Sequence, residues 1–309
     1  MSNVSIVMTV YNAERYIVEA IRSILDQTMS DFEFIIVNDG STDRTKEIIA
    51  TFDDPRIQFY SLDHIGRARA LNYAVGKAQS PYIAFMDADD ISVQERIEKQ
   101  YHYLQQNPEI GLVSGWFALI DSSGMEMNIL RKLPAVHEEI EYEMTSHCSM
   151  CFPAAMMRRT LIIRVDGFNE QLNSAIDYDL FIRILPLSKI SNLQELLFYH
   201  RIHHSRITSR QHSEQLANTF NIAKSYLERL IMQSTSQYEK NKLFIRFGIN
   251  EYYRGSMTNA RHYFLSALPE CWKEWLLWRY LLPSFIGDKI IMRYRKNTNV
   301  MYTDTNYHE

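Results

Sequence analysis

The stretch Tyr82-Ile83-Ala84-Phe85-Met86-Asp87-Ala88-Asp89-Asp90 joins an apolar run directly to three carboxylates. A short apolar run of this kind is typical of a buried strand in a parallel sheet. The carboxylates that follow it repel one another, and a bound divalent cation would offset that repulsion. Their hard oxygen atoms favour Mg²⁺ or Mn²⁺. The stretch therefore predicts a metal site at a strand end, with a solvated loop before a helix as the alternative.

The residues before this stretch repeat the pattern of a short apolar strand followed by a helix. Strands are predicted over residues 4–11, 32–38, 57–61 and 82–86. Apolar residues recur at helical spacing after each of the first three strands, which indicates βαβ units and a mostly parallel sheet. After the fourth strand, Ser92 and Glu95 have the spacing of a capping box and predict the start of a helix. The first hundred residues thus predict an α/β fold.

Polar and aromatic residues stand at the ends of these predicted strands. Thr9 and Tyr11 end the first strand, and Asp39 ends the second. In an open α/β sheet, ligands bind at the carboxyl ends of the strands. We therefore expect these three residues and the acidic cluster to line one crevice.

The second half of the chain has a different pattern. Strands are predicted over residues 111–117 and 196–202 and a short helix over 177–185, whereas nearly everything beyond Arg210 has helical spacing. These patterns predict a catalytic α/β domain over residues 1–209 and a helical domain over 210–309.

Composition limits the class of protein. The chain has 309 residues, a net charge of −4 and only three cysteines. This charge is unfavourable for a general nucleic-acid binder, and the cysteine count suits a reducing compartment. The start of the chain has no signal-peptide pattern, and no apolar run approaches the roughly 18 residues that a membrane span needs. We expect a cytoplasmic location without integral membrane insertion.

Four ordered motifs give the chain a resemblance to family 2 of the glycosyltransferases, which are inverting enzymes with the GT-A fold. The motifs cover residues 5–12, 36–43, 66–72 and 84–100, and the resemblance extends over about residues 4–205. The first two resemble the family's first strand and nucleotide-binding turn. The last two resemble its donor loop and its DXD segment with the following helix. The resemblance implies a Rossmann-like sheet, flanked by helices, that binds a nucleotide diphosphate sugar.

The resemblance also implies roles for particular residues. Thr9 and Tyr11 would line the base pocket, with a core aromatic as the alternative for Tyr11, and Asp39 would accept a hydrogen bond from the pyrimidine or ribose. Asp87 would contact the ribose or the metal, and Asp89 would ligate the Mn²⁺ or Mg²⁺ that bridges the donor phosphates. His203 is a further metal ligand in this interpretation, although the adjacent His200 and His204 leave the alignment open and an exposed loop histidine is the alternative.

A second carboxylate is needed on the acceptor side, because inversion requires a base for the proton of the attacking hydroxyl group. Asp177 is the candidate, since Asp177-Tyr178-Asp179-Leu180 resembles the segment that carries the family's base. The chain departs from the family at Ile176, where a glutamate is usual. Asp179 is the rival base, but its position two residues further along a helix favours a structural role.

Three other features have more than one interpretation. Arg67 and Arg69 could contact the diphosphate or form a solvated helix face. Cys148 and Cys151 have the spacing of half a zinc or redox site, but buried or acceptor-lining thiols fit better because no second pair exists. The aromatic and basic segment from Trp272 to Lys296 suits either a helical core, which we favour, or peripheral contact with a membrane.

The predicted activity is inverting transfer of a hexosyl or N-acetylhexosaminyl group from a nucleotide sugar, most simply a UDP-sugar. The acceptor would be a carbohydrate or lipid-linked molecule in polysaccharide or lipopolysaccharide synthesis, at the cytoplasmic face of the membrane. A nucleotidyltransferase would need a glycine-rich basic loop after the first strand, and residues 11–15 lack it. A catalytically degenerate donor-binding or scaffold protein is the alternative that Ile176 motivates.

Overall fold

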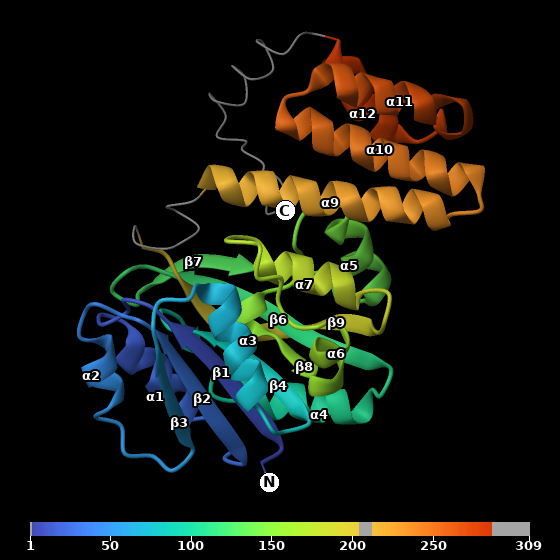
Figure 1. The fold of residues 1–309 in the computed structure, drawn as a ribbon. Helices are drawn as coiled ribbons and strands as arrows, with labels where there is room; N and C mark the ends of the chain where they lie inside the picture. Colours follow the sequence, from blue (N-terminus) through green and yellow to red (C-terminus); the bar gives the residue numbers. More distant parts are fainter. Residues whose placement is uncertain (1, 204–211, 286–309) are drawn as a thin grey trace. The chain divides into compact units, whose positions relative to one another are not determined.

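Four parallel strands form the N-terminal half of a single sheet. The structure is a computed structural model that describes residues 2–203 and 212–285 (Figure 1). The strand order in this half is β3-β2-β1-β4. The bounds are β1 (Val4–Val10), β2 (Phe32–Asp39), β3 (Ile57–Leu62) and β4 (Tyr82–Asp87). The predicted strands are confirmed, and their carboxyl ends lie at one edge of the sheet because the strands are parallel.

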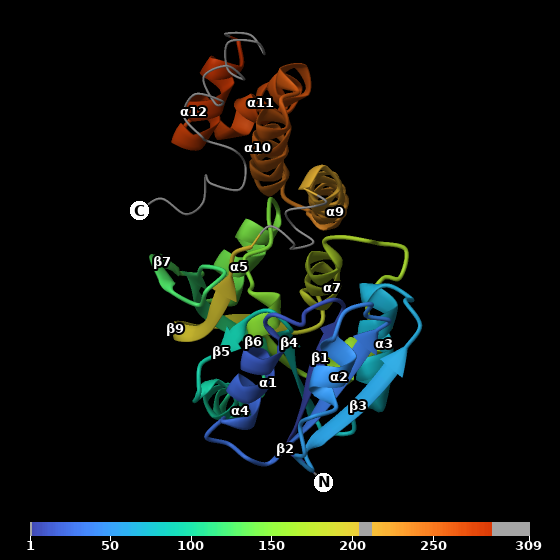
Figure 2. The ribbon, with the colours of Figure 1, turned by 90° about the vertical axis from the view of Figure 1, so that its left-hand side faces the viewer.

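Helices cover both faces of these strands, which explains their apolar sequences. Figure 2 shows α1 (Ile17–Leu25) and α3 (Arg67–Lys77) on opposite sides of the sheet. The short helix α2 (Thr45–Ile49) contacts α1. Nearly every residue of β1, β2 and β4 is buried. Burial on two faces favours continuous Val, Ile and Phe runs over an alternating pattern.

The remaining strands make the sheet mixed. The order continues from β4 through β8, β6 and β9 to β5, with β7 paired to β6. Only β6 and β9 pair in parallel in this half. The bounds are β5 (Ile91–Ser92), β6 (Ile110–Ile120), β7 (Glu126–Arg131), β8 (Met156–Arg158) and β9 (Lys189–Arg201). The last strand brings residues near position 200 beside the acidic loop that follows β4.

Helices α4 (Arg96–Gln106), α5 (His137–Met144), α6 (Arg159–Arg164) and α7 (Ile176–Ile184) complete this part. The predicted capping box is wrong, because Glu95 stands at the N-cap of α4 without a side-chain cap. Ser92 instead pairs with Phe198 in the sheet, and its hydroxyl accepts a hydrogen bond from Gln27 Nε2. A long-range strand pairing thus displaces a local cap.

The contacts of the chain divide it into two compact units. One consists of Met1–Met144 with Cys148–Asn218, and the other of Thr145–His147 with Thr219–Glu309. The predicted boundary near Ser209 lies outside the described residues, so the division into 1–209 and 210–309 stays a prediction. The helix α9 (His212–Gln233) spans the division at Asn218.

The second unit is helical, as expected. It contains α10 (Gln237–Arg254), α11 (Met257–Cys271) and α12 (Trp275–Ser284), which share a core that includes Ile245, Phe264 and Leu277. Gly248 allows the close approach of α11, since a Cβ atom there would lie 2.3 Å from a ring carbon of Phe264. Among the residues that the structure describes, no helix is both long and apolar enough to cross a bilayer.

Candidate active site

An exposed aromatic ring and a buried carboxylate stand together at the carboxyl ends of β1 and β2. Tyr11 is 47% exposed, and its ring stacks on His64 with 4.3 Å between the ring centroids. His64 Nδ1 lies 3.0 Å from Asp39 Oδ2. Thr9, the second-last residue of β1, is the one residue of that strand that is not fully buried. The three predicted donor residues of β1 and β2 are therefore brought together, and His64 joins them.

Asp39 positions the loop that precedes α3. Its carboxylate accepts hydrogen bonds from the backbone amides of Ile65 at 2.7 Å and Gly66 at 3.1 Å. The loop packs closely on Gly40, where φ is +70° and a Cβ atom would lie 2.6 Å from the backbone nitrogen of His64. Only glycine meets both demands without strain. Asp39 thus holds the predicted donor loop against the strand end, besides any contact that it makes with a nucleotide.

The three carboxylates after β4 converge on one point. One oxygen from each of Asp87, Asp89 and Asp90 lies within 4.8 Å of the others. Thr9 is the partner of Asp87 in the β1–β4 register, so the acidic cluster adjoins the strand end that precedes Tyr11. The residues expected to line a crevice therefore lie next to one another at this edge of the sheet.

The surroundings of Asp87 change its protonation. Burial raises its pKa to about 6, with the charges of Asp89 and Asp90 acting in the same direction and Arg67 opposing them. Arg67 donates a hydrogen bond of 2.7 Å to this carboxylate. Arg67 therefore offsets part of the repulsion in the cluster, and the cluster still retains affinity for a proton or another cation.

Two histidines of the β9 segment each contact a different carboxylate. His200 Nδ1 lies 3.0 Å from Asp90 Oδ2, and His203 Nε2 lies 2.9 Å from Asp89 Oδ2. Asp90 is buried, and its other oxygen accepts the backbone amide of Arg201. The two histidines therefore differ in what they contact. His200 and the buried Asp90 connect β9 to the acidic loop, whereas His203 lies beside the more exposed Asp89. His204 lies outside the described residues.

The pair Asp89 and His203 fits a divalent cation. Neighbouring ligand atoms of an octahedral ion with bonds of about 2.1 Å lie roughly 3 Å apart. The observed separation of 2.9 Å between the carboxylate oxygen and the imidazole nitrogen matches that spacing. Carboxylate and imidazole are also accepted ligands of Mn²⁺. Asp87 offers a further carboxylate oxygen within 4.8 Å of one from Asp89.

The buried side chain of Arg201 stabilises the acidic loop through its backbone. Its side chain is 1% exposed, and its Nε donates to the carbonyl of Asp89 at 2.8 Å. A terminal nitrogen forms an ion pair with Glu19 of α1 at 2.5 Å. The guanidinium also lies over the ring of Tyr16, which packs against the His203 ring at 4.7 Å between centroids. One buried cation thus links α1, the acidic loop and the segment that carries His203.

Asp177 acts electrostatically on Arg67, the residue that also contacts the acidic cluster. Burial lowers the pKa of Arg67, but the charges of Asp87, Asp177 and Asp89 outweigh this and raise it overall. Arg67 is therefore within electrostatic reach of the predicted metal carboxylates and of the predicted base. Asp177 stands in the first turn of α7, after Ala175, which has a left-handed φ of 55°.

The two neighbouring residues, Ile176 and Asp179, have other contacts than those expected of the predicted base. Ile176 is buried, so the position where the family usually has a glutamate faces the core here. Asp179 forms an ion pair of 2.8 Å with Arg183 one turn further along α7. The pairing supports the predicted structural role of Asp179.

The two arginines and two cysteines considered from the sequence differ in their exposure to solvent. Arg69 is 60% exposed and pairs with Glu170, as expected for a solvated helix face, whereas Arg67 points to Asp87. Cys148 and Cys151 are free thiols. Burial, with a contribution from Asp177, raises the pKa of Cys148 well above its usual range. Such thiols are weak ligands and nucleophiles at neutral pH.

Three residues of the site had no clear signal in the sequence. His64 lies in a loop of no regular pattern, and the contacts of that loop with Asp39 and Gly40 bring the ring onto Tyr11. The sequence places Asp90 with the other carboxylates, although its partners come from β9. Arg201 could have been noticed as a charge at the end of an apolar strand, which is costly to bury without a partner.

Comparison with solved structures identifies the fold. The chain superimposes on S. aureus TarS 1–349 in complex with UDP with a TM-score of 0.61, 16% identity and coverage of 96% of this chain and 92% of that one. The mannosyltransferase PcManGT of Pyrobaculum calidifontis, in complex with GDP-Man and Mn²⁺, gives a TM-score of 0.54 at 15% identity, with 88% of each chain covered. The mixed sheet with an acidic cluster at its parallel edge is thus a GT-A glycosyltransferase fold, followed by a helical region.

Sequence comparison identifies the family. The model of Glycosyl transferase family 2 matches residues 5–166. The O-antigen biosynthesis glycosyltransferase WbnJ of Escherichia coli is 36% identical over 206 residues, with 65% of this chain and 80% of that protein covered. An uncharacterized glycosyltransferase of Methanocaldococcus jannaschii is 35% identical, with 64% and 70% covered. The protein belongs to glycosyl transferase family 2.

Proposed function

We propose that the protein transfers a sugar, with inversion, from a UDP-sugar to a carbohydrate or lipid-linked acceptor. The observation that supports this proposal is that Arg67 donates a hydrogen bond to Asp87 and that the charges of Asp87, Asp177 and Asp89 all raise its pKa. The proposal takes the acidic cluster as the donor side and Asp177 as a separate carboxylate near the same arginine. Displacement at a sugar carbon needs these two groups on opposite sides of the reacting carbon.

The donor side is assigned to residues of the parallel strands. Tyr11 offers a ring face to the pyrimidine, Thr9 lines the pocket, and Asp39 accepts a hydrogen bond while holding the loop before α3. Asp89 and His203 would hold Mn²⁺ or Mg²⁺, with Asp87 beside them. A cation bound there supplies charge neutralisation for the diphosphate leaving group. Arg67, paired with Asp87, adds a further positive charge at this place.

The acceptor side is assigned to Asp177. Its carboxylate takes the proton of the acceptor hydroxyl group as that oxygen forms a bond to the anomeric carbon. The bond from the anomeric carbon to the phosphate oxygen breaks in the same step, and the electron pair leaves with the nucleoside diphosphate. Attack from the face opposite the leaving group inverts the configuration.

The acceptor and the location form part of the same proposal. WbnJ is named for O-antigen biosynthesis, and the chondroitin synthase of Escherichia coli is 27% identical over 230 residues, with 74% of this chain and 33% of that protein covered. Both names support an acceptor in polysaccharide assembly. We place the protein at the cytoplasmic face of a membrane, where it would meet a lipid-linked acceptor.

Release of nucleoside diphosphate from a panel of nucleotide sugars tests the proposed activity. Purified protein is incubated with each donor, with Mn²⁺ and with EDTA in parallel. We expect cation-dependent turnover that is fastest with a UDP-hexose or UDP-N-acetylhexosamine. Donor binding without turnover under any condition would favour the degenerate donor-binding protein that Ile176 suggests.

Replacement of Tyr11 tests the base pocket. Stacking of a base on an aromatic ring contributes about 1–3 kcal/mol, so Tyr11→Ala should raise the donor KM by about 5- to 100-fold. Tyr11→Phe keeps the ring and should keep the KM within about threefold of the wild type. Steady-state kinetics with varied donor distinguish the two. Equal KM values for the wild type and Tyr11→Ala would remove Tyr11 from the pocket.

The pH dependence of cation binding tests the acidic cluster. The pKa of Asp87 is raised to about 6, so a proton competes with the cation below that pH and not above it. For one such group, the apparent affinity for Mn²⁺ should fall about tenfold from pH 7 to pH 5. Calorimetric titration at several pH values measures this change. An affinity that is independent of pH over this range would contradict the assignment of the cluster.

A further inference from the structure

The helical unit carries an apolar surface that its own core does not use. We define the α12 face as Trp272, Trp275, Trp278, Leu282 and Phe285. The three tryptophans are 57%, 64% and 38% exposed, Leu282 is 61% exposed, and Phe285 is 59% exposed. The chain has only four tryptophans, so three of them are exposed within seven residues. Several large apolar side chains exposed together are typical of an interaction site, whereas scattered exposed ones are not.

Helix geometry gathers these residues on one side of α12. Trp275, Trp278 and Leu282 are three and four residues apart, which places them on one helix face. Leu277 and Leu281 point to another face and are buried in the core with α10 and α11. The helix therefore has two apolar faces, one packed in the unit and one uncovered by the described residues.

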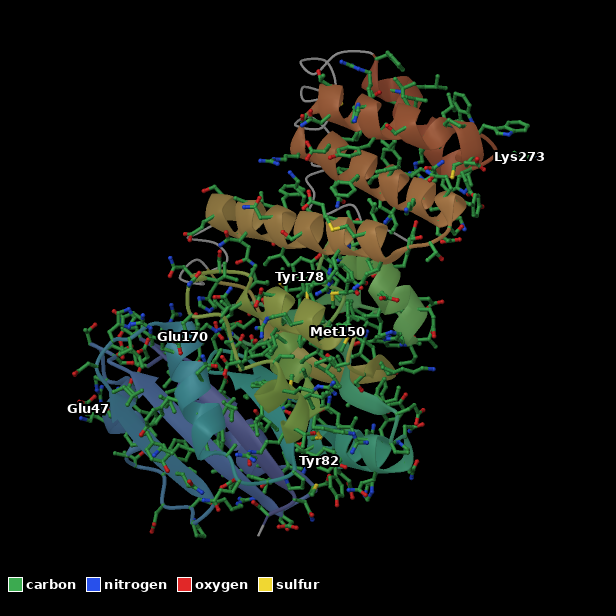
Figure 3. The ribbon with its side chains drawn as sticks, turned by 45° about the vertical axis from the view of Figure 1, so that its right-hand side comes forward. Glu47, Tyr82, Met150, Glu170, Tyr178 and Lys273 are labelled. Carbon is green, nitrogen blue, oxygen red and sulfur yellow. The ribbon has the colours of Figure 1, made fainter. Side chains whose placement is uncertain are left out.

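Positive charges accompany two of the three tryptophan rings of the α12 face. Lys273 Nζ lies 5.2 Å from the ring centroid of Trp272, and Arg279 lies 5.4 Å from that of Trp275. Lys273, labelled in Figure 3, stands in the connection between α11 and α12. Aromatic rings flanked by long basic side chains suit the headgroup level of a bilayer, where the rings enter the interface and the cations meet lipid phosphates.

The stretch of sequence that carries the α12 face and continues past the described residues has a net charge opposite in sign to that of the whole chain. Residues 272–296 contain six Lys or Arg and two Asp or Glu, which gives +4, whereas the whole chain has −4. The rest of the chain therefore has a net charge of −8. A basic segment in an acidic protein is attracted to anionic lipids. A two-fold dimer through the same face would instead oppose its cations to one another.

We propose that the α12 face binds the surface of an anionic bilayer, with α12 in the plane of the interface. The tryptophan rings lie at the headgroup level, Leu282 and Phe285 reach the acyl boundary, and Lys273 and Arg279 contact lipid phosphates. This inference concerns the helical unit alone and does not depend on the sugar-transfer chemistry. It gives the protein a location at a membrane surface through the α12 face.

Vesicle flotation of the full chain tests this inference. We compare vesicles of phosphatidylcholine alone with vesicles that also contain phosphatidylglycerol. The wild type should float with the anionic vesicles and much less with the neutral ones, and high salt should release it. The double variant Trp275→Ala/Trp278→Ala should bind about tenfold or more weakly. Trp275 is 64% exposed, whereas Trp278 is 38% exposed and donates a hydrogen bond of 2.6 Å to the Trp272 carbonyl, so circular dichroism of the variant is measured in parallel and should match the wild type.

Two further variants separate the contributions. Lys273→Ala/Arg279→Ala removes the cations and should weaken binding to anionic vesicles only. Met232→Ala removes an apolar side chain of α9 that is 84% exposed and should bind like the wild type. Donor turnover by all variants should stay at the wild-type level in the absence of vesicles, which keeps this test apart from that of the catalytic proposal.

Intrinsic fluorescence gives a second measurement, because three of the four tryptophans belong to the α12 face. Anionic vesicles should shift the wild-type emission to shorter wavelength, and lipids brominated on the acyl chain should quench it. The inference is overturned if the wild type stays in the soluble fraction with anionic vesicles. It is equally overturned if the double tryptophan variant floats like the wild type, or if the face proves to be buried in a dimer or under the chain's own C-terminal segment.

Discussion

Asp177→Asn should lower kcat by about 10²- to 10⁴-fold, the usual contribution of a positioned general base. The amide has the shape of the carboxylate but cannot take up the proton of the acceptor hydroxyl group. Because Asp177 stands in the first turn of α7 and apart from the carboxylates after β4, donor binding should be unchanged. Steady-state kinetics with donor and acceptor, together with calorimetric titration of the donor, measure both effects.

Asp179→Asn is the matched control for this prediction. It makes the same chemical change two residues further along α7, at a carboxylate that is paired with Arg183. We expect a loss of thermal stability from the broken ion pair and a kcat within about tenfold of the wild type. If Asp179→Asn abolishes transfer and Asp177→Asn does not, the rival base is the correct one and the acceptor side must be reassigned.

Asp89→Asn should reduce kcat/KM by about 10³-fold, because a cation that stabilises the leaving diphosphate contributes several kcal/mol. The substitution removes the charged ligand atom that lies 2.9 Å from His203 Nε2. The variant should also bind Mn²⁺ at least tenfold more weakly. Activity at increasing Mn²⁺ and direct calorimetric titration measure the two effects separately. Partial recovery at high Mn²⁺ would agree with weakened ligation.

Asp53→Asn is a suitable control for Asp89→Asn. Asp53 is exposed and lies between α2 and β3, at the edge of the sheet opposite to the acidic cluster. The substitution Asp53→Asn changes the net charge by the same amount as Asp89→Asn, and it should leave both sugar transfer and Mn²⁺ binding unaffected. An Asp89→Asn variant with wild-type Mn²⁺ affinity and turnover would contradict the assignment of this carboxylate.

Much of the N-terminal half could be predicted because each strand and helix there can be recognised from the pattern of its own residues. The strands β1, β2 and β4 are buried on both faces, so each is a mainly apolar run, whereas β3 is a partly exposed edge strand that its β-branched and aromatic residues still predict. The parallel arrangement alone places Thr9, Asp39 and Asp87 at one edge of the sheet. The order of the four motifs along the chain indicates glycosyl transferase family 2, and the comparisons confirm this family.

The second half could be predicted only in part because its strands depend on distant partners. The strand β9 begins at Lys189, well before the predicted start at residue 196, because pairing with β6 extends it through polar residues. The same long-range pairing draws Ser92 out of the expected cap. Side-chain networks are subject to the same limit, since His200 and Arg201 meet the acidic loop across about 110 residues of sequence.

The most direct test is a crystal of the protein soaked with Mn²⁺ and a UDP-sugar, with anomalous data collected to locate the ion. The ion should lie between the Asp89 carboxylate and the His203 imidazole and contact both phosphates. The uracil should stack on Tyr11, and Asp177 should face the anomeric carbon from the side away from the diphosphate. A bound nucleotide with no ion at these carboxylates, or Asp177 directed away from the sugar, would contradict the account.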